Sequence, residues 1–326
     1  WAIVTGVAPG AVTVTHKYYY RYGSWRTETK DITVQEASPI TVEDTILDNG
    51  GLTVEAQGVD LTDATFQWYI GSSKNGNFQT VEDYEEAEGE YCGFVPCEGE
   101  PNTLFVARAG AQKWFYVEVT LADGLTTYTS EPVLVDYYDE LQNGGFEDPS
   151  SSAMSDYQYN YRGATFWQVP DSIDGLHWKT TGHGENYAHK GPDYFIEIVD
   201  GGNAKPVYNT TRSGRFAELN CEVVGALYQD VLTAPGTVLH WGLEHSGRNN
   251  SDETMQVVIT GVKGLPEDWN PAGQVLDEED GVQITIQDGV DDWTYYTDGS
   301  AGAAGPYVVP EGQYVTRFYF ISSDNY

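Results

Sequence analysis

Apolar and polar residues alternate along most of this chain, which is the pattern of β-strands with one buried face. Phe66, Trp68 and Ile70, for example, alternate with Gln67 and Tyr69. No long apolar run has helical spacing, and the 24 Tyr and 36 Gly residues favour sheets and turns. The pattern predicts an all-β protein with very little helix.

The 326 residues divide into three segments where this pattern changes. The segments are residues 1–35, 36–136 and 137–326. In the first, residues 11–22 and 26–34 are expected to form a hairpin that turns at Gly23 and Ser24. So few strands cannot bury a core alone. The first segment is therefore not expected to form an independent domain.

The first segment also resembles a known family. Its run from Val4 to Val14, which reads Val-Thr-Gly-Val-Ala-Pro-Gly-Ala-Val-Thr-Val, resembles the last part of a bacterial Ig-like domain of the group 2 type. The resemblance implies that an earlier part of this domain precedes Trp1.

The second segment reads as a β-sandwich. Alternation places Trp68 inward, like the core tryptophan of an Ig sandwich. Phe115, Val117 and Val119 form another inward row. The acidic run from Glu82 to Glu100 is expected to be a solvated loop.

Two runs in this segment carry a resemblance. Phe66–Tyr69 and Trp114–Val119 resemble the Ig-like repeats of bacterial surface proteins. The resemblance implies an Ig-like β-sandwich over residues 36–136.

The third segment alternates between strand-like runs and polar, Gly-rich turns, which predicts a jelly roll or a similar sandwich. The expected strands are 195–199, 215–220, 227–232, 237–245, 254–260, 282–286, 293–297 and 316–322. The runs Asn143-Gly-Gly-Phe-Glu147, Phe216–Asn220, Pro235–Trp241 and Thr316–Phe320 resemble the jelly-roll, carbohydrate-binding and galactose-binding-like modules of large surface proteins in Gram-positive bacteria. The resemblance implies one further strand beyond Tyr326.

The charge excludes some partners. Asp and Glu number 50 against 16 Lys and Arg, a net charge of −34. Nucleic acid and anionic membranes are therefore not expected partners, because both require a basic surface. No apolar run reaches the roughly 20 residues of a membrane span, so no membrane insertion is expected.

The three cysteines do not form a disulfide framework or a CxxC metal motif. Cys92 and Cys97 lie close enough in sequence to close a small disulfide. Cys221 falls in an expected strand and is interpreted as a buried free thiol.

Calcium is the one cofactor that the resemblance suggests. Related jelly rolls hold a structural Ca²⁺ near their first strand with backbone carbonyls and a carboxylate, and Glu147 matches the acidic position after Asn-Gly-Gly-Phe. Oxygen ligands of this kind suit a hard cation. The alternative is that Glu147 is an exposed turn residue.

A glycan site is the other candidate. Sugar-binding sites combine an aromatic platform with a few fixed polar groups. The candidates in the third segment are Trp167, His177, Trp178, Glu218, Asn220, Gln229, His245 and Arg248. Alternation places Glu218 and Asn220 on the same face of their strand. The alternative is an ordinary solvated sheet face, with Trp178 in the core.

These features predict a non-catalytic fragment of a secreted, extracellular bacterial surface protein. Its jelly-roll module would bind a carbohydrate or host glycan, and the Ig-like domains would serve as spacers. Two alternatives remain open. The chain could hold accessory modules of a secreted glycan-degrading enzyme, or it could be a stalk or filament subunit that self-associates through edge strands and the Tyr18–Tyr22 hairpin.

Overall fold

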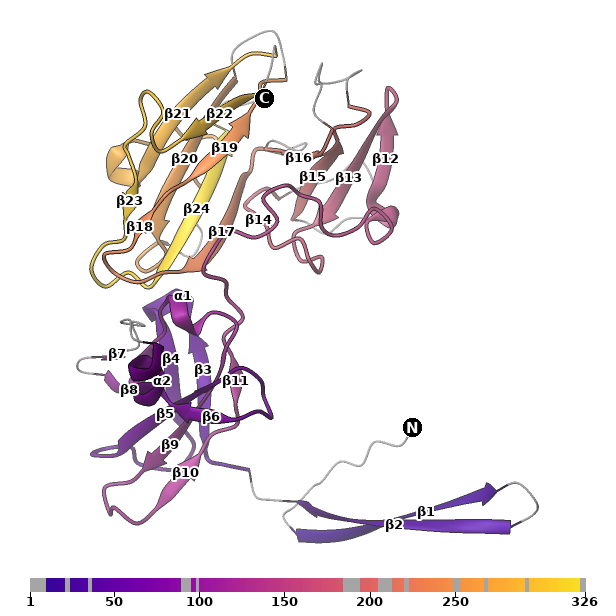
Figure 1. The fold of residues 1–326 in the computed structure, drawn as a ribbon, viewed down its shortest axis with the longest axis vertical. Helices are drawn as coiled ribbons and strands as arrows, with labels where there is room; N and C mark the ends of the chain where they lie inside the picture. Colours follow the sequence, from indigo (N-terminus) through magenta and orange to yellow (C-terminus); the bar gives the residue numbers. More distant parts are fainter. Residues whose placement is uncertain are drawn as a thin grey trace.

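The computed structural model describes residues 10–20, 24–34, 37–88, 95–97, 100–183, 194–204, 213–219, 223–248, 253–266, 269–290 and 293–322. Within these ranges the chain forms a hairpin followed by two β-sandwiches (Figure 1). The prediction of an all-β fold built from β-sandwiches is confirmed. The predicted Cys92–Cys97 disulfide lies outside the described residues, because Cys92 is not among them.

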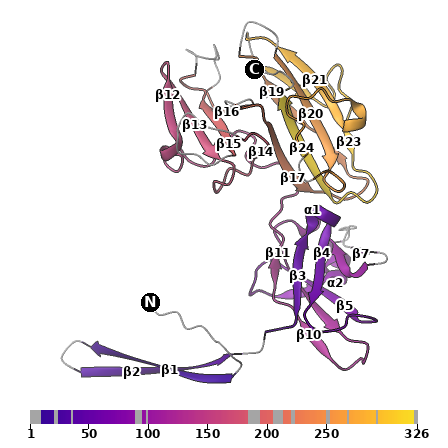
Figure 2. The same ribbon diagram turned by 180° about the vertical axis from the view of Figure 1, so that it is seen from behind.

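The hairpin consists of β1 (Gly10–Tyr20) and β2 (Ser24–Val34), which pair antiparallel from Gly10 opposite Val34 to Tyr20 opposite Ser24. The ribbon extends away from both sandwiches (Figures 1 and 2). In the described part of the chain, neither strand pairs with any other strand.

The first sandwich contains two sheets. One has the order β3 (Ile40–Thr45), β4 (Gly51–Ala56), β8 (Glu100–Phe105), β7 (Val95–Cys97). The other has the order β10 (Thr127–Thr129), β9 (Trp114–Thr120), β5 (Thr65–Gly71), β6 (Phe78–Thr80), and β11 (Val133–Leu134) also pairs with β9. The core between them contains Trp68, Phe115, Val117 and Val119, so the predicted inward rows are confirmed.

Short helices complete the first sandwich. They are α1 (Ile46–Asn49), α2 (Val81–Glu88) and the 3₁₀ turn η1 (Arg108–Gly110). The prediction of a solvated loop from Glu82 to Glu100 is wrong where the structure describes this run, because residues 82–88 are helical and Val95–Cys97 and Glu100 lie in β7 and β8. Val81 is buried and Tyr84 packs against the core, so the helix has a reason to form against the sheets.

The second sandwich is larger. Its five-stranded sheet has the order β14 (Lys179–Thr180), β17 (Ala226–Leu232), β24 (Val315–Ser322), β20 (Glu253–Gly261), β21 (Val282–Asp288). The opposing layer contains a four-stranded sheet, β12 (Gln158–Tyr161), β13 (Ala164–Pro170), β15 (Phe195–Asp200), β16 (Arg215–Glu218). It also contains the pairs β18 (Val238–Leu239) with β23 (Tyr307–Val308) and β19 (Gly242–His245) with β22 (Thr294–Thr297). Two 3₁₀ turns are η2 (Ser155–Tyr157) and η3 (Glu278–Asp280).

Two clusters fill the space between these layers. One joins Trp167 and Ile196 of the four-stranded sheet to Leu227 of the five-stranded sheet. The other joins Leu243 and Tyr296 to strands β20, β21 and β24. Side chains that alternate with these residues therefore lie on the outer face of the second layer.

Candidate functional site

A row of polar side chains crosses the outer face of the four-stranded sheet. Gln168 on β13, Glu197 on β15 and Glu218 on β16 are direct cross-strand partners. Their strand neighbours Trp167 and Ile196 point into the core, so this row faces outward. Yet Glu197 is only 3% exposed. A buried carboxyl group requires hydrogen-bond partners.

Glu197 receives these hydrogen bonds from two neighbouring strands. The hydroxyl of Tyr159 donates to its Oε2 at 2.6 Å, and Nε2 of Gln168 donates to the same oxygen at 2.8 Å. Burial, and then the nearby charge of Glu218, raises the pKa of Glu197 to about 8. The fold thus favours the protonated acid at this position, next to the carboxyl group of Glu218.

Glu218 connects this row to the next pair of strands. Nη1 of Arg248, which follows β19, donates to Oε1 of Glu218 at 2.6 Å. The backbone N–H of Arg248 donates to Oε2 of Glu253 at 2.8 Å. The structure therefore brings together Glu218 and Arg248, two of the residues singled out in the sequence.

An exposed aromatic ring lies on the same side of this layer. Tyr295 of β22 is 66% exposed and pairs with Glu244 of β19. Leu243 and Tyr296 point into the core, so Tyr295 and Glu244 face outward. A Cβ atom on Gly242 would lie 2.6 Å from the hydroxyl oxygen of Tyr295. The tyrosine therefore lies against the backbone of β19 and covers the glycine.

A second aromatic contact joins the two parts of the outer face. Trp293, which directly precedes β22, meets the ring of Phe216 of β16 edge-on, with ring centres 5.1 Å apart. Phe216 belongs to the cluster on the outer face of the four-stranded sheet. This contact and the Arg248–Glu218 ion pair make a continuous surface from β12 to β22, which we call the outer polar face.

The predicted tryptophans lie elsewhere. Trp167 and Trp178 are each 4% exposed and belong to the core between the layers. Nε1 of Trp178 donates to the carbonyl oxygen of Asn143 at 3.0 Å. The guanidinium of Arg215 lies 5.1 Å from the ring centre of Trp167. Both rings therefore pack within the protein.

The other predicted polar residues are also dispersed. Gln229 accepts from the backbone N–H of Gln142 at 2.9 Å and donates to its carbonyl oxygen at 2.7 Å. Nδ1 of His245 lies 2.9 Å from Oδ2 of Asp288. His177 is exposed, with its ring edge-on to Tyr138. Asn220 lies outside the described residues.

Glu147, the predicted calcium ligand, contacts an arginine. Its Oε1 accepts the backbone N–H of Arg215 at 3.0 Å, and its Oε2 lies 4.0 Å from Nε of the same residue. The backbone carbonyls of this turn also accept from Arg215. With this guanidinium among them, these oxygens do not fit a calcium ion. In the described part of the chain, no group of three or more His, Cys, Asp or Glu side chains could hold a metal.

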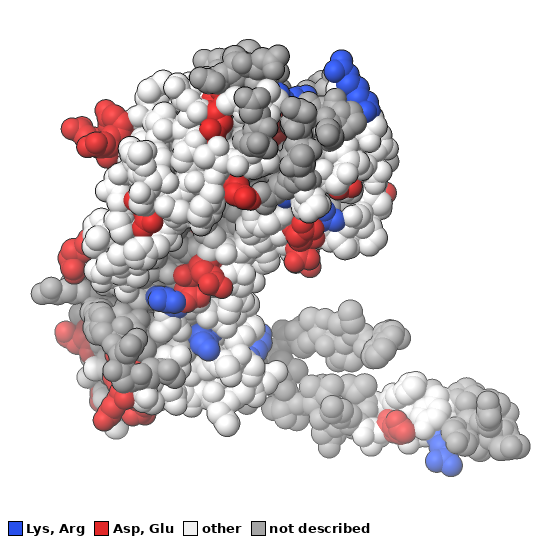
Figure 3. Space-filling model, turned by 45° about the horizontal axis from the view of Figure 1, so that its top comes forward, with Lys and Arg blue, Asp and Glu red and all other residues white. Residues whose placement is uncertain are grey.

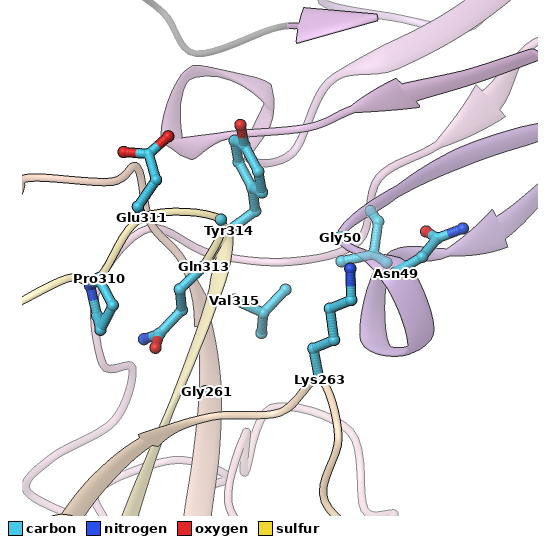
Figure 4. A pocket seen from close by; sticks show the side chains of 11 residues that line it. Asn49, Gly50, Gly261, Lys263, Pro310, Glu311, Gln313, Tyr314 and Val315 are labelled. Atoms are coloured by element: carbon cyan, nitrogen blue, oxygen red, sulfur yellow. The ribbon is translucent and has the colours of Figure 1, made fainter. Parts of the chain in front are cut away.

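A cavity of about 230 Å³ lies where the two sandwiches meet (Figure 4). Gly50 of the first sandwich and Lys263, Gln313 and Tyr314 of the second are among its lining residues. Oε1 of Gln313 accepts from Tyr307, and its Nε2 donates to Thr316. The side-chain amide of Gln313 therefore stabilises the second sandwich, to which it belongs.

Three residues of the outer polar face were not among the sequence candidates: Tyr159, Gln168 and Tyr295. Glu197 and Gln168 each interrupt an apolar run, which is the available signal for a buried polar group. Tyr295 is adjacent to Tyr296 in sequence. Composition does not tell which of two neighbouring tyrosines points outward, since that depends on the register of the strand.

The molecular surface is acidic. On the side shown in Figure 3, Asp and Glu side chains are spread over both sandwiches, and Lys and Arg are few. The net charge of −34 has the wrong sign for attracting a polyanion. No helix in the described ranges has the length and apolar character needed to cross a membrane.

Comparison with known proteins gives little further guidance. No family model and no curated protein matches the chain. Among solved structures, it is similar to one from a study of carbohydrate-binding modules of the β-sandwich superfamily. The two share 12% identity, the match covers 87% of this chain and 90% of that chain, and the TM-score is 0.19. A similarity this weak does not bear on the ligand.

Proposed function

We propose that the second sandwich is a non-catalytic module that binds a neutral glycan on its outer polar face. The observation that carries the proposal is the exposed ring of Tyr295, which lies against Gly242 on the same surface as the Arg248–Glu218 pair. The apolar C–H face of a sugar stacks on such a ring, and fixed charged groups hydrogen-bond its hydroxyls.

The enclosed position of Glu197 suits a binding module. Glu197 is enclosed and held by Tyr159 and Gln168, which suits a group that positions Glu218 and Arg248. The acidic surface favours uncharged glycans over sulfated or uronic acid polymers, because like charges repel. The wider setting that we propose, an extracellular bacterial surface protein, rests on the sequence resemblance alone.

A glycan array tests the proposal, followed by titration of any neutral oligosaccharide that binds. Tyr295→Ala should weaken binding by about tenfold, since an aromatic contact contributes ~0.5–1.5 kcal/mol beyond buried area. Gly242→Val should weaken binding as well, because a side chain there displaces Tyr295. Leu125→Ala, at a residue that is 89% exposed on the first sandwich, is the control. An array without any bound glycan would refute the proposal, as would equal affinity for all these proteins.

A second candidate function concerns the hairpin. The ribbon of β1 and β2 lies apart from the sandwiches, with its outer edges unpaired within the described residues. Unpaired strand edges can add strands from a second copy. We therefore propose self-association as an additional role. Light scattering tests it, and a concentration-independent monomer mass would exclude it.

A further inference from the structure

In the turn that begins the second sandwich, several backbone carbonyl groups surround the side chain of Arg215. Nη1 of Arg215 donates to the carbonyl oxygens of Phe146 at 3.3 Å, Glu147 at 2.7 Å and Pro149 at 2.8 Å. Nη2 donates to Oγ of Ser151 at 2.7 Å. Three backbone oxygens and one hydroxyl thus converge on a single guanidinium.

The remaining sides of Arg215 are also occupied. The ring of Trp167 lies 5.1 Å from the guanidinium, and the carboxylate of Glu147 contacts both the backbone N–H and Nε. The side chain is 12% exposed. A cation so enclosed is stable only when surrounding acceptors compensate for lost water, and this turn supplies them.

The shape of the turn is fixed by other contacts. Asn143 and Phe146 adopt left-handed φ angles of 49° and 56°. Nδ2 of Asn143 donates to the carbonyls of Asp148 at 2.6 Å and Leu176 at 3.0 Å, and its Oδ1 accepts the N–H of Asp148. The carbonyl groups of the turn are therefore preorganised to face inward. Their oxygens concentrate negative potential at the point where the guanidinium of Arg215 lies.

We infer that Arg215 is the built-in cation of this turn, and that the turn folds without calcium. A calcium ion needs six to eight oxygen ligands. Here the converging oxygens already accept hydrogen bonds from a positive group, and a divalent ion among them would face that charge at close range. The aromatic ring on the other side suits a planar guanidinium and offers no ligand to a hard metal.

Thermal melting of the whole chain in calcium chloride and in chelator tests this inference. The wild type should melt at the same temperature in both. Because an acidic surface can bind calcium elsewhere, Glu147→Gln is melted in parallel. A calcium-dependent rise that Glu147→Gln abolishes would overturn the inference. A rise that persists in this variant would place calcium away from the turn and support it.

Substitution of the arginine gives an independent test. Arg215→Met keeps much of the side-chain length but removes the charge and the donors, so its melting temperature should fall by several degrees. The melting temperature of Arg215→Lys should fall less, because lysine keeps the positive charge but lacks the planar set of N–H donors of the guanidinium. Arg162→Met, at an exposed arginine over Tyr161, is the matched control. An Arg215→Met protein as stable as the control would contradict the inference. If Arg215→Met does not fold, the wild-type melts still decide the question.

Discussion

Glu197 lies beneath the surface of the second sandwich, where Tyr159 and Gln168 donate to the same carboxylate oxygen. Glu218 is hydrogen-bonded to it as well and, with burial, raises its pKa to about 8. In the unfolded chain this group has its ordinary pKa of 4.5. Between these two values the folded protein holds a proton that the unfolded chain releases.

This difference makes stability depend on pH. The contribution of Glu197 is fully present below about pH 4.5 and is lost as pH rises to about 8, since the unfolded state then binds fewer protons. Glu197→Gln resembles the protonated acid and does not titrate. The free energy of unfolding of Glu197→Gln, relative to that of the wild type, should therefore be a few kcal/mol higher at pH 8 than at pH 5. Urea denaturation at both pH values measures this gain.

The overall charge of the protein also changes with pH, so only the difference between variant and wild type is informative. Glu43→Gln, at an exposed position of β3, is the control and should show no such gain. A constant difference between Glu197→Gln and the wild type across this range would mean that Glu197 is ionised throughout.

The sequence predicted part of the outer polar face. Alternation placed Glu218 among polar residues of a strand, and this holds in the structure. Its contact with Arg248 joins residues 30 positions apart, one on β16 and one in the segment after β19, and these two strands do not pair with each other. Likewise, the burial of Trp167 under Arg215 depends on how the turn at 143–149 folds. Such contacts come from tertiary packing and leave no local pattern.

At the scale of elements, four of the five strands in the five-stranded sheet were predicted well. β17, β20, β21 and β24 lie close to their expected positions. By contrast, β13 was not predicted, although it is buried on both faces like β15, which was predicted. The expected strand over 237–245 is split into β18 and β19, which pair with different partners. Trp241 lies between them and is buried in the core.

The helix α2 had a local signal. The backbone N–H of Asp83 donates to Oγ1 of Thr80 at 3.1 Å, as in an N-terminal cap. Thr80 and Asp83 have the spacing of a capping motif, and Val81 and Tyr84 are spaced to contact the core. The density of acidic residues concealed this pattern, since charge alone favours a solvated loop.

The segment before β12 is held to the five-stranded sheet by the side chain of Gln229. Gln229 is 5% exposed and bonds both backbone groups of Gln142. Gln229→Leu should destabilise the protein by about 2–4 kcal/mol, because it leaves the part-buried backbone N–H and carbonyl of Gln142 unpaired. Equilibrium urea unfolding measures the loss. Gln287→Leu, at an exposed position of β21, should change stability little, and an equally small loss at Gln229 would show that water replaces its hydrogen bonds.

At the scale of the whole molecule, the two sandwiches share a hydrophobic core. Leu232 and Val315 of the second sandwich belong to the same buried cluster as the core of the first. The rings of Phe105 and Tyr314 stack with centres 4.6 Å apart across the junction. Nε of Arg108 donates to Asp139 at 2.9 Å. Packing of this kind holds the outer polar face in a fixed direction relative to the first sandwich.

A shared core predicts that the two sandwiches unfold together. Calorimetry of the wild type should show one transition for residues 37–322, with equal calorimetric and van't Hoff enthalpies.

Tyr314 is 8% exposed, and Tyr314→Ala should lower the free energy of unfolding by about 3–5 kcal/mol through the lost packing. Because the lost packing lies at the junction between the two sandwiches, the single unfolding transition should separate into two. Tyr295→Ala, which truncates an exposed tyrosine of the same sandwich, should keep a single transition near the wild-type temperature. Two resolved transitions in the wild type would instead mean that the first sandwich is an independent spacer.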